Sequence, residues 1–336
     1  MGLDLSPDLD NQPQLFGAFN NPLLRLQGLC VEYSTPRGPV HAVDGVTIDI
    51  GSGEFIGLAG ESGCGKSTIA QAILRVLHPP AVITGGEIWF ENQDILSMDL
   101  AELERFRWQG ISLVFQSAMN ALNPVMRIRD QITDVIEVHS KLSRADAIQR
   151  ASELLDLVGI GQKRLMDYPH QLSGGMRQRV VIAIALALNP KMIIMDEPTT
   201  AVDVVVQQQI IQETQDLKER FGFSVMFITH DLSLLVEISD RIGIMYAGEI
   251  VELAPSRSLF TYPLHPYTQG LMSSFPALTG ARERLTGIPG TPPDLVFPPP
   301  GCRFHLRCPL VQSRCKVSKP AYQQVSPGHF VACHLV

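Results

Sequence analysis

The feature that most constrains this chain is a glycine-rich stretch, Gly60-Glu61-Ser62-Gly63-Cys64-Gly65-Lys66-Ser67-Thr68. It matches the pattern G-x-x-x-x-G-K-[ST], in which glycines let consecutive backbone N–H groups surround a phosphate. An apolar run (55–59) precedes it and a helix-forming run (69–74) follows, which is the strand–loop–helix setting that an anion site at a helix N-terminus requires. We therefore predict that Lys66 reaches the β- and γ-phosphates of a nucleotide and that Ser67 binds Mg²⁺.

Length and composition limit the remaining possibilities. The 336 residues allow one large domain with an appendage, or two domains. The longest apolar run, 180–188, is far shorter than the roughly 20 residues that span a bilayer. Residues 1–21 contain no basic and apolar segments of the kind that form a secretory signal, and we predict a flexible tail there. A net charge of −7 gives no electrostatic footprint for nucleic acid, so we expect a cytosolic chain that does not bind it.

Four short apolar runs each stop at a polar residue that could take part in chemistry. The runs are 55–59 before the glycine-rich loop, 111–115 before Gln116, 192–195 before Asp196 and Glu197, and 224–229 before His230. Continuous apolar runs of this length are typical of parallel strands that are covered on both faces. Ligands of such sheets bind beyond the carboxyl ends of the strands. The sequence therefore predicts that these polar groups converge around one nucleotide.

The two adjacent carboxylates have distinct expected roles. Asp196 directly follows an apolar strand and could hold Mg²⁺. Glu197 could orient and deprotonate the attacking water as a general base. Without the glycine-rich loop upstream, the pair would equally fit a solvated turn at a strand end. Gln116 could contact the metal or the water and His230 the γ-phosphate, but each residue type also occurs at strand ends for structural reasons.

An aromatic residue upstream of the loop is a candidate for contact with a nucleotide base. Tyr33 lies at the end of the run 26–33, and it precedes the loop in sequence. An exposed ring there could stack on adenine. The alternative is a tyrosine packed in the core or on an edge strand.

A second glycine-rich stretch narrows the class of nucleotide-binding protein that the sequence indicates. Ser173 is a good helix N-cap in the segment Leu172-Ser173-Gly174-Gly175-Met176-Arg177-Gln178-Arg179, and Asn189-Pro190 stops the helix that it begins. Gly174 and Gly175 leave backbone N–H groups uncovered at the helix start, which makes a second anion site. Because the chain already has its own phosphate loop, this site is best explained as a cap on the nucleotide of a partner molecule.

With these motifs the chain resembles the nucleotide-binding subunits of ABC transporters. The resemblance implies that 60–68 is the Walker A motif, that Gln116 is the Q-loop glutamine, and that His230 is the switch histidine. It also implies that Asp196 and Glu197 are the Walker B pair. The residues that it places on ATP are Tyr33, Gly60, Ser62, Gly63, Cys64, Gly65, Lys66, Ser67, Thr68, Ser173, Gly174, Gly175 and Asp203, and those on Mg²⁺ are Ser67, Gln116 and Asp196.

The resemblance further implies how two chains work together. In this class, two ATPase subunits close head to tail on two ATP molecules, each held between one Walker A motif and the other subunit's signature, here 172–176. The segment 199–203 would be the D-loop. Met176 departs from the commonest signature, which has Gln, and we expect activity to survive because Ser173 and the backbone do the phosphate work. Since every hydrolytic residue is present, this chain should not form a degenerate site.

Within this superfamily, the chain is most similar to ATPase subunits of oligopeptide and dipeptide importers. The similarity covers about 24–334 and rests on the segments 38–45, 119–124, 168–170, 174–179 and 265–268. It implies two transmembrane permeases, an extracytoplasmic binding protein, a second ATPase subunit that we expect to be a paralogue, and a place at the cytoplasmic face of the membrane. Nickel complexes or oligosaccharides stay open as alternative cargo.

We expect an α/β, RecA-like ATPase domain over 22–254, interrupted by a helical subdomain over about 117–188. A helix should begin at Ser143, which opens a capping-box pattern, and continue to about Val158. The proline-rich segment 255–336 is expected to be an irregular extension.

The extension contains four of the six cysteines, Cys302, Cys308, Cys315 and Cys333, spaced C-x5-C-x6-C-x17-C. In a cytosolic chain, clustered cysteines favour a metal site over disulfides. Four thiolates can hold a [4Fe–4S] cluster or Zn²⁺, and the spacing does not choose between them, nor does it exclude free thiols. The importer resemblance favours the iron–sulfur cluster, with a structural role.

Two rival functions fit the motifs less well. A soluble ABC-type ATPase acting on DNA or ribosomes would typically have coiled-coil insertions, zinc hooks or two cassettes in one chain. This sequence has one cassette, no sustained heptads and no basic stripe. A regulatory subunit that binds ATP without hydrolysis is disfavoured by the intact Glu197 and His230.

Overall fold

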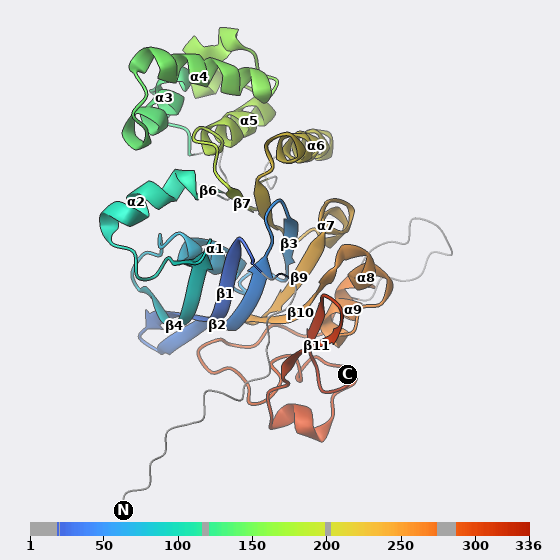
Figure 1. Cartoon of the computed structure of the whole chain (residues 1–336). Helices are drawn as coiled ribbons and strands as arrows, with labels where there is room; N and C mark the ends of the chain where they lie inside the picture. The colour runs from blue at the N-terminus through green and yellow to red at the C-terminus, as the bar shows by residue number, and fades with distance from the viewer. Residues whose placement is uncertain (1–18, 20, 116–120, 199–202, 274–286) are drawn as a thin grey trace, which may run out of the picture.

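The computed structural model describes residues 19, 21–115, 121–198, 203–273 and 287–336. It contains two β-sheets flanked by helices, with a helical lobe at one end and the C-terminal segment at the other (Figure 1). The smaller sheet has the strand order β2 (Gly38–Ile50), β1 (Leu24–Thr35), β4 (Ala81–Phe90) and β5 (Gln93–Asp94). All of its pairings are antiparallel.

The larger, eight-stranded sheet positions the chemistry. Its order is β11 (Tyr322–Ser326), β12 (His329–Ala332), β10 (Glu249–Pro255), β9 (Arg241–Tyr246), β3 (Phe55–Ala59), β8 (Ser224–Ile228), β7 (Met192–Asp196) and β6 (Ile111–Val114). The stretch from β9 to β6 is parallel throughout. The four apolar runs are thus neighbouring parallel strands, as predicted, and their carboxyl ends meet at one edge.

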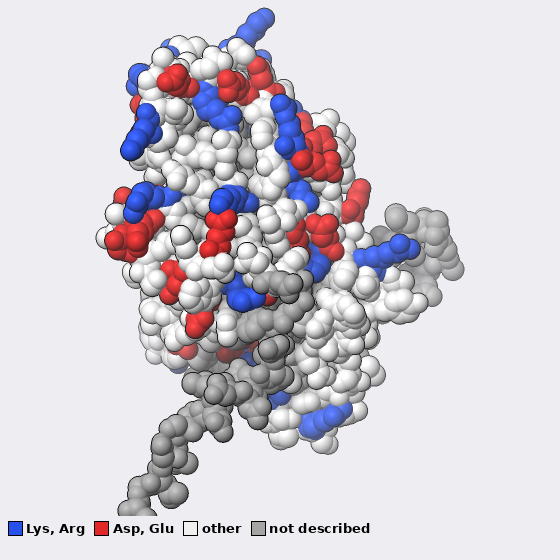
Figure 2. All heavy atoms as spheres, viewed as in Figure 1, with Lys and Arg blue, Asp and Glu red and all other residues white. Residues whose placement is uncertain are grey.

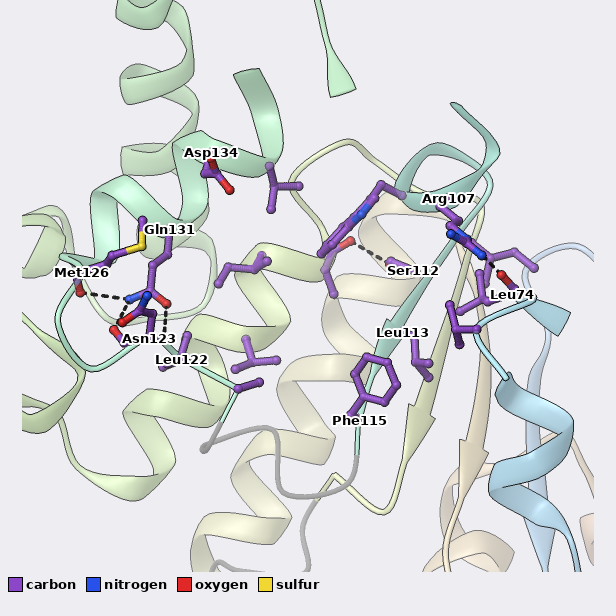
Figure 3. A pocket seen from close by; sticks show the side chains of 18 residues that line it. Leu74, Arg107, Ser112, Leu113, Phe115, Leu122, Asn123, Met126, Gln131 and Asp134 are labelled. Atoms are coloured by element: carbon purple, nitrogen blue, oxygen red, sulfur yellow. Dashed lines mark hydrogen bonds between the residues drawn. The ribbon is translucent and has the colours of Figure 1, made fainter. Parts of the chain in front are cut away.

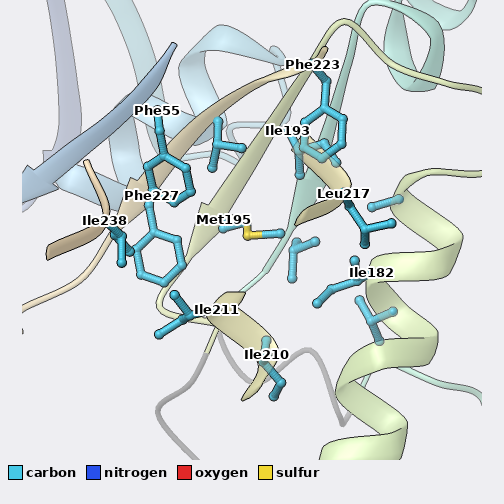
Figure 4. Packing of buried hydrophobic residues seen from close by; sticks show 14 of the residues in the cluster. Phe55, Ile182, Ile193, Met195, Ile210, Ile211, Leu217, Phe223, Phe227 and Ile238 are labelled. Carbon is cyan, nitrogen blue, oxygen red and sulfur yellow. The ribbon is translucent and has the colours of Figure 1, made fainter. Parts of the chain in front are cut away.

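Both faces of this sheet are buried, which explains why its strands are apolar without alternation. Successive residues of β7 enter different cores: Ile193 and Met195 pack in one cluster, whereas Met192 and Ile194 pack in the other. The first cluster joins the sheet to the helices α5 (Gly174–Ala185), α6 (Val204–Phe221) and α7 (Leu232–Ile238). Figure 4 shows Met195 and Ile193 facing Ile182 and Leu217 there. The second cluster lies between the sheet, α1 (Lys66–Ile73) and the smaller sheet.

The helical lobe is formed by consecutive helices, α3 (Ile128–His139), α4 (Arg144–Leu157) and α5 (Gly174–Ala185), with short 3₁₀ turns at Gln162–Met166 and Pro169–Gln171. The predicted cap of α4 is confirmed, since the Ser143 hydroxyl accepts a hydrogen bond from the Asp146 N–H at 3.2 Å. The remaining helices are α2 (Leu100–Gln109), α6 (Val204–Phe221), α7 (Leu232–Ile238), α8 (Ser256–Thr261) and α9 (Pro266–Met272). No described helix is long and apolar enough to cross a membrane.

The C-terminal segment differs from the irregular extension that was predicted. It contains α8, α9, a 3₁₀ turn (Ser313–Lys316) and the hairpin β11–β12, which extends the large sheet through pairing of β12 with β10. A buried carboxylate ties these parts together: Glu252 of β10 contacts His329 Nε2 at 2.8 Å and accepts hydrogen bonds from the Leu264 and His265 N–H groups. Proline density did not indicate this hairpin, because its pairing partner β10 lies far away in the sequence.

Charged side chains of both signs are mixed on the face shown in Figure 2. Lys and Arg alternate there with Asp and Glu over the helical lobe, and no continuous basic surface forms on that face.

Candidate active site

The glycine-rich loop connects β3 to α1, in the setting that the sequence predicted. Two of its glycines are required by close packing: an added Cβ would lie 2.1 Å from the Met245 carbonyl oxygen at Gly60 and 2.1 Å from the Ala42 carbonyl oxygen at Gly65. Both glycines also have positive φ, +153° and +107°, which side-chain-bearing residues rarely adopt. Lys66 is buried, and its Nζ donates to the carbonyls of Gly60 (2.8 Å) and Glu61 (3.1 Å).

The predicted magnesium ligands lie side by side. The Ser67 hydroxyl, at the start of α1, donates to Asp196 Oδ1 at 3.0 Å, and Asp196 is the last residue of β7. Burial raises the pKa of the Asp196 carboxyl, and the adjacent Glu197 acts in the same direction, while the hydrogen bond from Ser67 opposes them. A hydroxyl and a carboxylate are hard oxygen donors of the kind that Mg²⁺ prefers, so this pair fits a magnesium ion bound with nucleotide phosphates.

The second carboxylate contacts the predicted histidine. Glu197 Oε1 lies 3.7 Å from His230 Nδ1; the histidine side chain is 68% exposed and the carboxylate 18%. The backbone N–H of Glu197 donates to the Ile228 carbonyl at 2.8 Å, which fixes the chain at the ends of β7 and β8. Both residues therefore lie at the strand edge, as predicted. Gln116 lies outside the described residues.

Tyr33 lies against the start of α1. Its hydroxyl is 3.2 Å from Thr68 Oγ1, the last residue of the glycine-rich loop, and its side chain is half-buried on β1. The sequence left open whether this tyrosine is a core residue or a base contact. The structure brings it next to the phosphate loop.

The second glycine-rich stretch begins α5 in the helical lobe. Ser173 caps this helix by accepting a hydrogen bond from the Met176 N–H at 3.3 Å, and it is exposed. Gly175 is needed for packing, because an added Cβ would lie 2.7 Å from Val206 Cγ1 on α6. Asp203 caps α6 by accepting from the Val206 N–H at 3.0 Å. The signature and the end of the segment predicted as D-loop are thus neighbours, and 199–202 lie outside the described residues.

The sequence did not identify residues of the C-terminal segment that contact the phosphate loop. Arg307 forms a two-pronged ion pair with Glu61, with Nη1–Oε2 at 2.8 Å and Nη2–Oε1 at 2.9 Å. The Tyr267 hydroxyl accepts a hydrogen bond from the Glu61 N–H at 3.1 Å. These residues come more than 200 positions after Glu61, and no local pattern in the sequence indicated the contact.

The four-cysteine metal site that the sequence predicted is not supported by the arrangement of the thiols. Among the described residues, no group of three or more His, Cys, Asp or Glu side chains is placed to hold a metal ion, and Cys302, Cys308, Cys315 and Cys333 are free thiols. Burial raises the pKa of Cys302 to about 11, and the neighbouring Cys333 and Cys315 add to this shift. Burial therefore favours the protonated form of Cys302, which is a poor metal ligand.

The C-terminal segment has other attachments to the core. Arg303, nearly inaccessible, contacts Asp44 at 2.5 Å and Glu249 at 3.0 Å, and Lys319 contacts the same two carboxylates. Phe304 packs in the large core beside the rings of Tyr246 and Tyr267. In this structure, ion pairs and aromatic packing hold the segment that a metal was expected to staple.

A pocket of about 400 Å³ lies between the helical lobe and the sheet. Figure 3 shows its lining, in which Phe115 and Leu113 from the end of β6 face residues of the helical lobe across the opening. The lining is mainly apolar and includes Leu122, Met126, Val135, Val181 and Ile184. Phe115 is 46% exposed, directly before the position predicted as the Q-loop glutamine.

Known proteins match both parts of the chain. The family model described as "ABC transporter" matches residues 43–200, and the one described as "Oligopeptide/dipeptide transporter, C-terminal region" matches 251–315. The chain is 44% identical to the oligopeptide transport ATP-binding protein OppD of Bacillus subtilis (strain 168) over 94% of its length and 89% of the relative's. It is 43% identical to the dipeptide transport ATP-binding protein DppD of the same strain, over 93% of this chain and 94% of the relative.

A solved structure agrees with this match. A dimeric post-hydrolysis state of the ATP-binding cassette MJ0796 with ADP and Pi is 31% identical, with a TM-score of 0.62, and covers 70% of this chain and 99% of that one. The fold and site together define an ATPase of the ATP-binding cassette class. More closely, the chain belongs to the family of ABC transporter ATP-binding proteins that have the oligopeptide/dipeptide type of C-terminal region.

Proposed function

We propose that this chain hydrolyses ATP to power the import of oligopeptides or dipeptides through a membrane transporter. The observation that carries the proposal is the convergence of the phosphate loop with Asp196, Glu197 and His230 at one sheet edge, in a chain whose relatives are named for oligopeptide and dipeptide transport. The same edge lies next to an apolar pocket that could receive a membrane partner.

In the proposed reaction, the loop N–H groups and Lys66 hold the β- and γ-phosphates. Ser67 and Asp196 would hold Mg²⁺, which would supply positive charge against the charge that develops in phosphoryl transfer. Glu197 accepts a proton from the attacking water. His230, within 3.7 Å of Glu197, orients this carboxylate and contacts the γ-phosphate. Tyr33 stacks on the adenine.

A second ATPase subunit completes the site. The exposed Ser173 and the Gly174–Gly175 start of α5 belong to the helical lobe, whereas the chain's own phosphate loop precedes α1 in the other part of the molecule (Figure 1). We propose that they close on the nucleotide of a partner chain, with Asp203 near the contact between the subunits. Closure of the pair would bind two ATP molecules, and hydrolysis would release it.

The apolar pocket between the lobes is the proposed contact with a permease at the cytoplasmic face of the membrane. Its lining would accept the apolar side of a short permease helix. Phe115→Ser should abolish co-purification of the permease and leave ATP binding by the free chain unchanged. Phe221→Ser is a matched control, because Phe221 is 44% exposed at the end of α6. Equal permease recovery with both variants would refute this docking site.

Peptide uptake by the host tests the cargo. A deletion strain that requires an amino acid should fail to grow when the amino acid is supplied only in a peptide, and the wild-type gene should restore growth while Glu197→Gln should not. If the deletion strain grows on peptide but fails to accumulate nickel or an oligosaccharide, the cargo is that alternative.

Beyond ATP and Mg²⁺, the proposed cofactor is a [4Fe–4S] cluster on Cys302, Cys308, Cys315 and Cys333, with Zn²⁺ as the alternative. It is supported by the clustering of four of the chain's six cysteines in this one segment. Binding would require them to lose their protons and turn towards a common centre. Chain purified without oxygen should contain about four iron and four sulfide per molecule, and Cys315→Ser should lose them. Absence of both iron and zinc would refute the proposal.

A further inference from the structure

The start of the phosphate loop is held by the C-terminal segment of the same chain. Two hydrogen bonds join the guanidinium of Arg307 to the carboxylate of Glu61, at 2.8 and 2.9 Å. The backbone N–H of Glu61 is held as well, by the hydroxyl of Tyr267 at 3.1 Å. Both the side chain and the main chain of this loop residue are therefore fixed from the C-terminal segment.

Arg307 is itself firmly placed. Its side chain is only 5% exposed, and all five of its N–H donors have acceptors. Besides the Glu61 carboxylate, these are the hydroxyl of Tyr246 (3.3 Å) and the carbonyls of Pro289 (2.8 Å) and Ile288 (3.4 Å). The guanidinium also lies over the ring of Tyr246, 5.7 Å from its centroid. Because its position is determined from several sides, Arg307 can impose a position on Glu61.

Glu61 in turn supports the lysine of the loop. Nζ of Lys66 donates to the carbonyl oxygen of Glu61 at 3.1 Å and to that of Gly60 at 2.8 Å. The residue that Arg307 fixes thus supplies part of the platform on which Lys66 rests. A loop that is already ordered loses less conformational freedom when it binds phosphate.

We propose that Arg307 is a positioning residue for the ATP site: through Glu61 it holds the phosphate loop in its binding shape, so that the C-terminal segment sets the affinity for ATP. This inference rests on the proposed function, nucleotide binding at this loop. Arg307 acts through Glu61 and does not itself contact the nucleotide.

The test measures binding of Mg-ATP to the full chain by titration calorimetry, together with KM and kcat for hydrolysis. Arg307→Ala should weaken ATP binding about tenfold, which is about 1.4 kcal/mol, and should raise KM while kcat at saturating ATP stays within about twofold. Glu61→Gln should give a similar loss, and the double variant should add little to either, because both changes break one interaction. Arg307→Lys keeps the positive charge but cannot form two parallel hydrogen bonds to the carboxylate. Its ATP affinity should lie between those of the wild type and Arg307→Ala.

Arg303→Ala is the matched control. Arg303 is a second buried arginine of the same segment, and its ion pairs are with Asp44 and Glu249 instead of the loop. Both alanine variants should lower the melting temperature, but only Arg307→Ala should weaken ATP binding. Equal weakening in Arg303→Ala would assign the effect to general docking of the segment and overturn the proposal. Wild-type affinity in Arg307→Ala and Glu61→Gln would also overturn it, whereas a wild-type chain that fails to bind ATP would overturn the proposed function itself.

Discussion

Replacement of Glu197 by Gln is the sharpest test of the catalytic assignment. The amide keeps the size of the side chain and can still contact His230, which lies 3.7 Å away, but it cannot accept a proton from water. A positioned general base contributes about 10²- to 10⁴-fold to a reaction rate. The adjacent carboxylate, Asp196, accepts a hydrogen bond from Ser67 at 3.0 Å and is expected to hold Mg²⁺, so it cannot take over this role.

We therefore expect kcat to fall about a thousandfold, equivalent to about 4 kcal/mol in the activation free energy. Affinity for Mg-ATP should stay within about twofold, because the residues that hold the phosphates are untouched. Phosphate release at saturating Mg-ATP measures the first quantity and titration calorimetry the second. Glu219→Gln, at an exposed position of α6, is the control for loss of a carboxylate elsewhere. Hydrolysis by Glu197→Gln within tenfold of the wild type would refute the assignment of the base.

Three further predictions concern the binding of Mg²⁺, the stacking of adenine on Tyr33, and the stability of the fold in acid. Asp196→Asn should raise the Mg²⁺ concentration needed for half-maximal hydrolysis at least tenfold. An unchanged Mg²⁺ requirement would refute the assignment of Asp196 as a ligand. Tyr33→Ala should weaken ATP binding about 5- to 100-fold through loss of stacking, whereas Tyr33→Phe should retain wild-type affinity; equal losses would instead indicate that the hydrogen bond to Thr68 matters. Burial lowers the pKa of His265 from 6.5 to about 4. Between pH 6.5 and pH 4 the unfolded chain therefore binds more protons than the folded chain. The free energy of unfolding falls as the pH drops through this window, by up to about 3 kcal/mol. His265→Asn, which keeps a capping acceptor for the Tyr267 N–H, should lose less stability than the wild type between pH 6.5 and 4 in thermal unfolding, and an identical loss would contradict this.

The parts of the site that the sequence predicted are those whose geometry follows from local order along the chain. A glycine-rich loop between a strand and a helix, or a carboxylate at a strand end, takes its place once the strand is parallel and buried. Lys66, Ser67 and Asp196 come together for this reason. The helix cap at Ser143 follows equally from its four-residue pattern.

What the sequence could not predict depends on contacts between distant segments. The pair Arg307–Glu61 joins residues 246 positions apart, and β12 pairs with β10 across a long connection. Each contact is decided by packing and not by local propensity. The cysteines illustrate the same limit, since their spacing indicated a common site but did not fix the orientation of the thiols. Among the described residues, these thiols form no group that is placed to hold a metal ion.

The order of the strands also suggests which part of the molecule moves. The C-terminal hairpin and the helical lobe attach at opposite ends of the large sheet, and the phosphate loop follows β3 between them. The C-terminal side is closely held, with buried ion pairs at Arg303 and Arg307. The other side contains the pocket of about 400 Å³ between the sheet and the lobe. Because interfaces with unfilled apolar space lose fewer contacts when they shift than well-packed ones, displacement during closure should fall on the helical lobe, and the phosphate loop should keep its position on the C-terminal side.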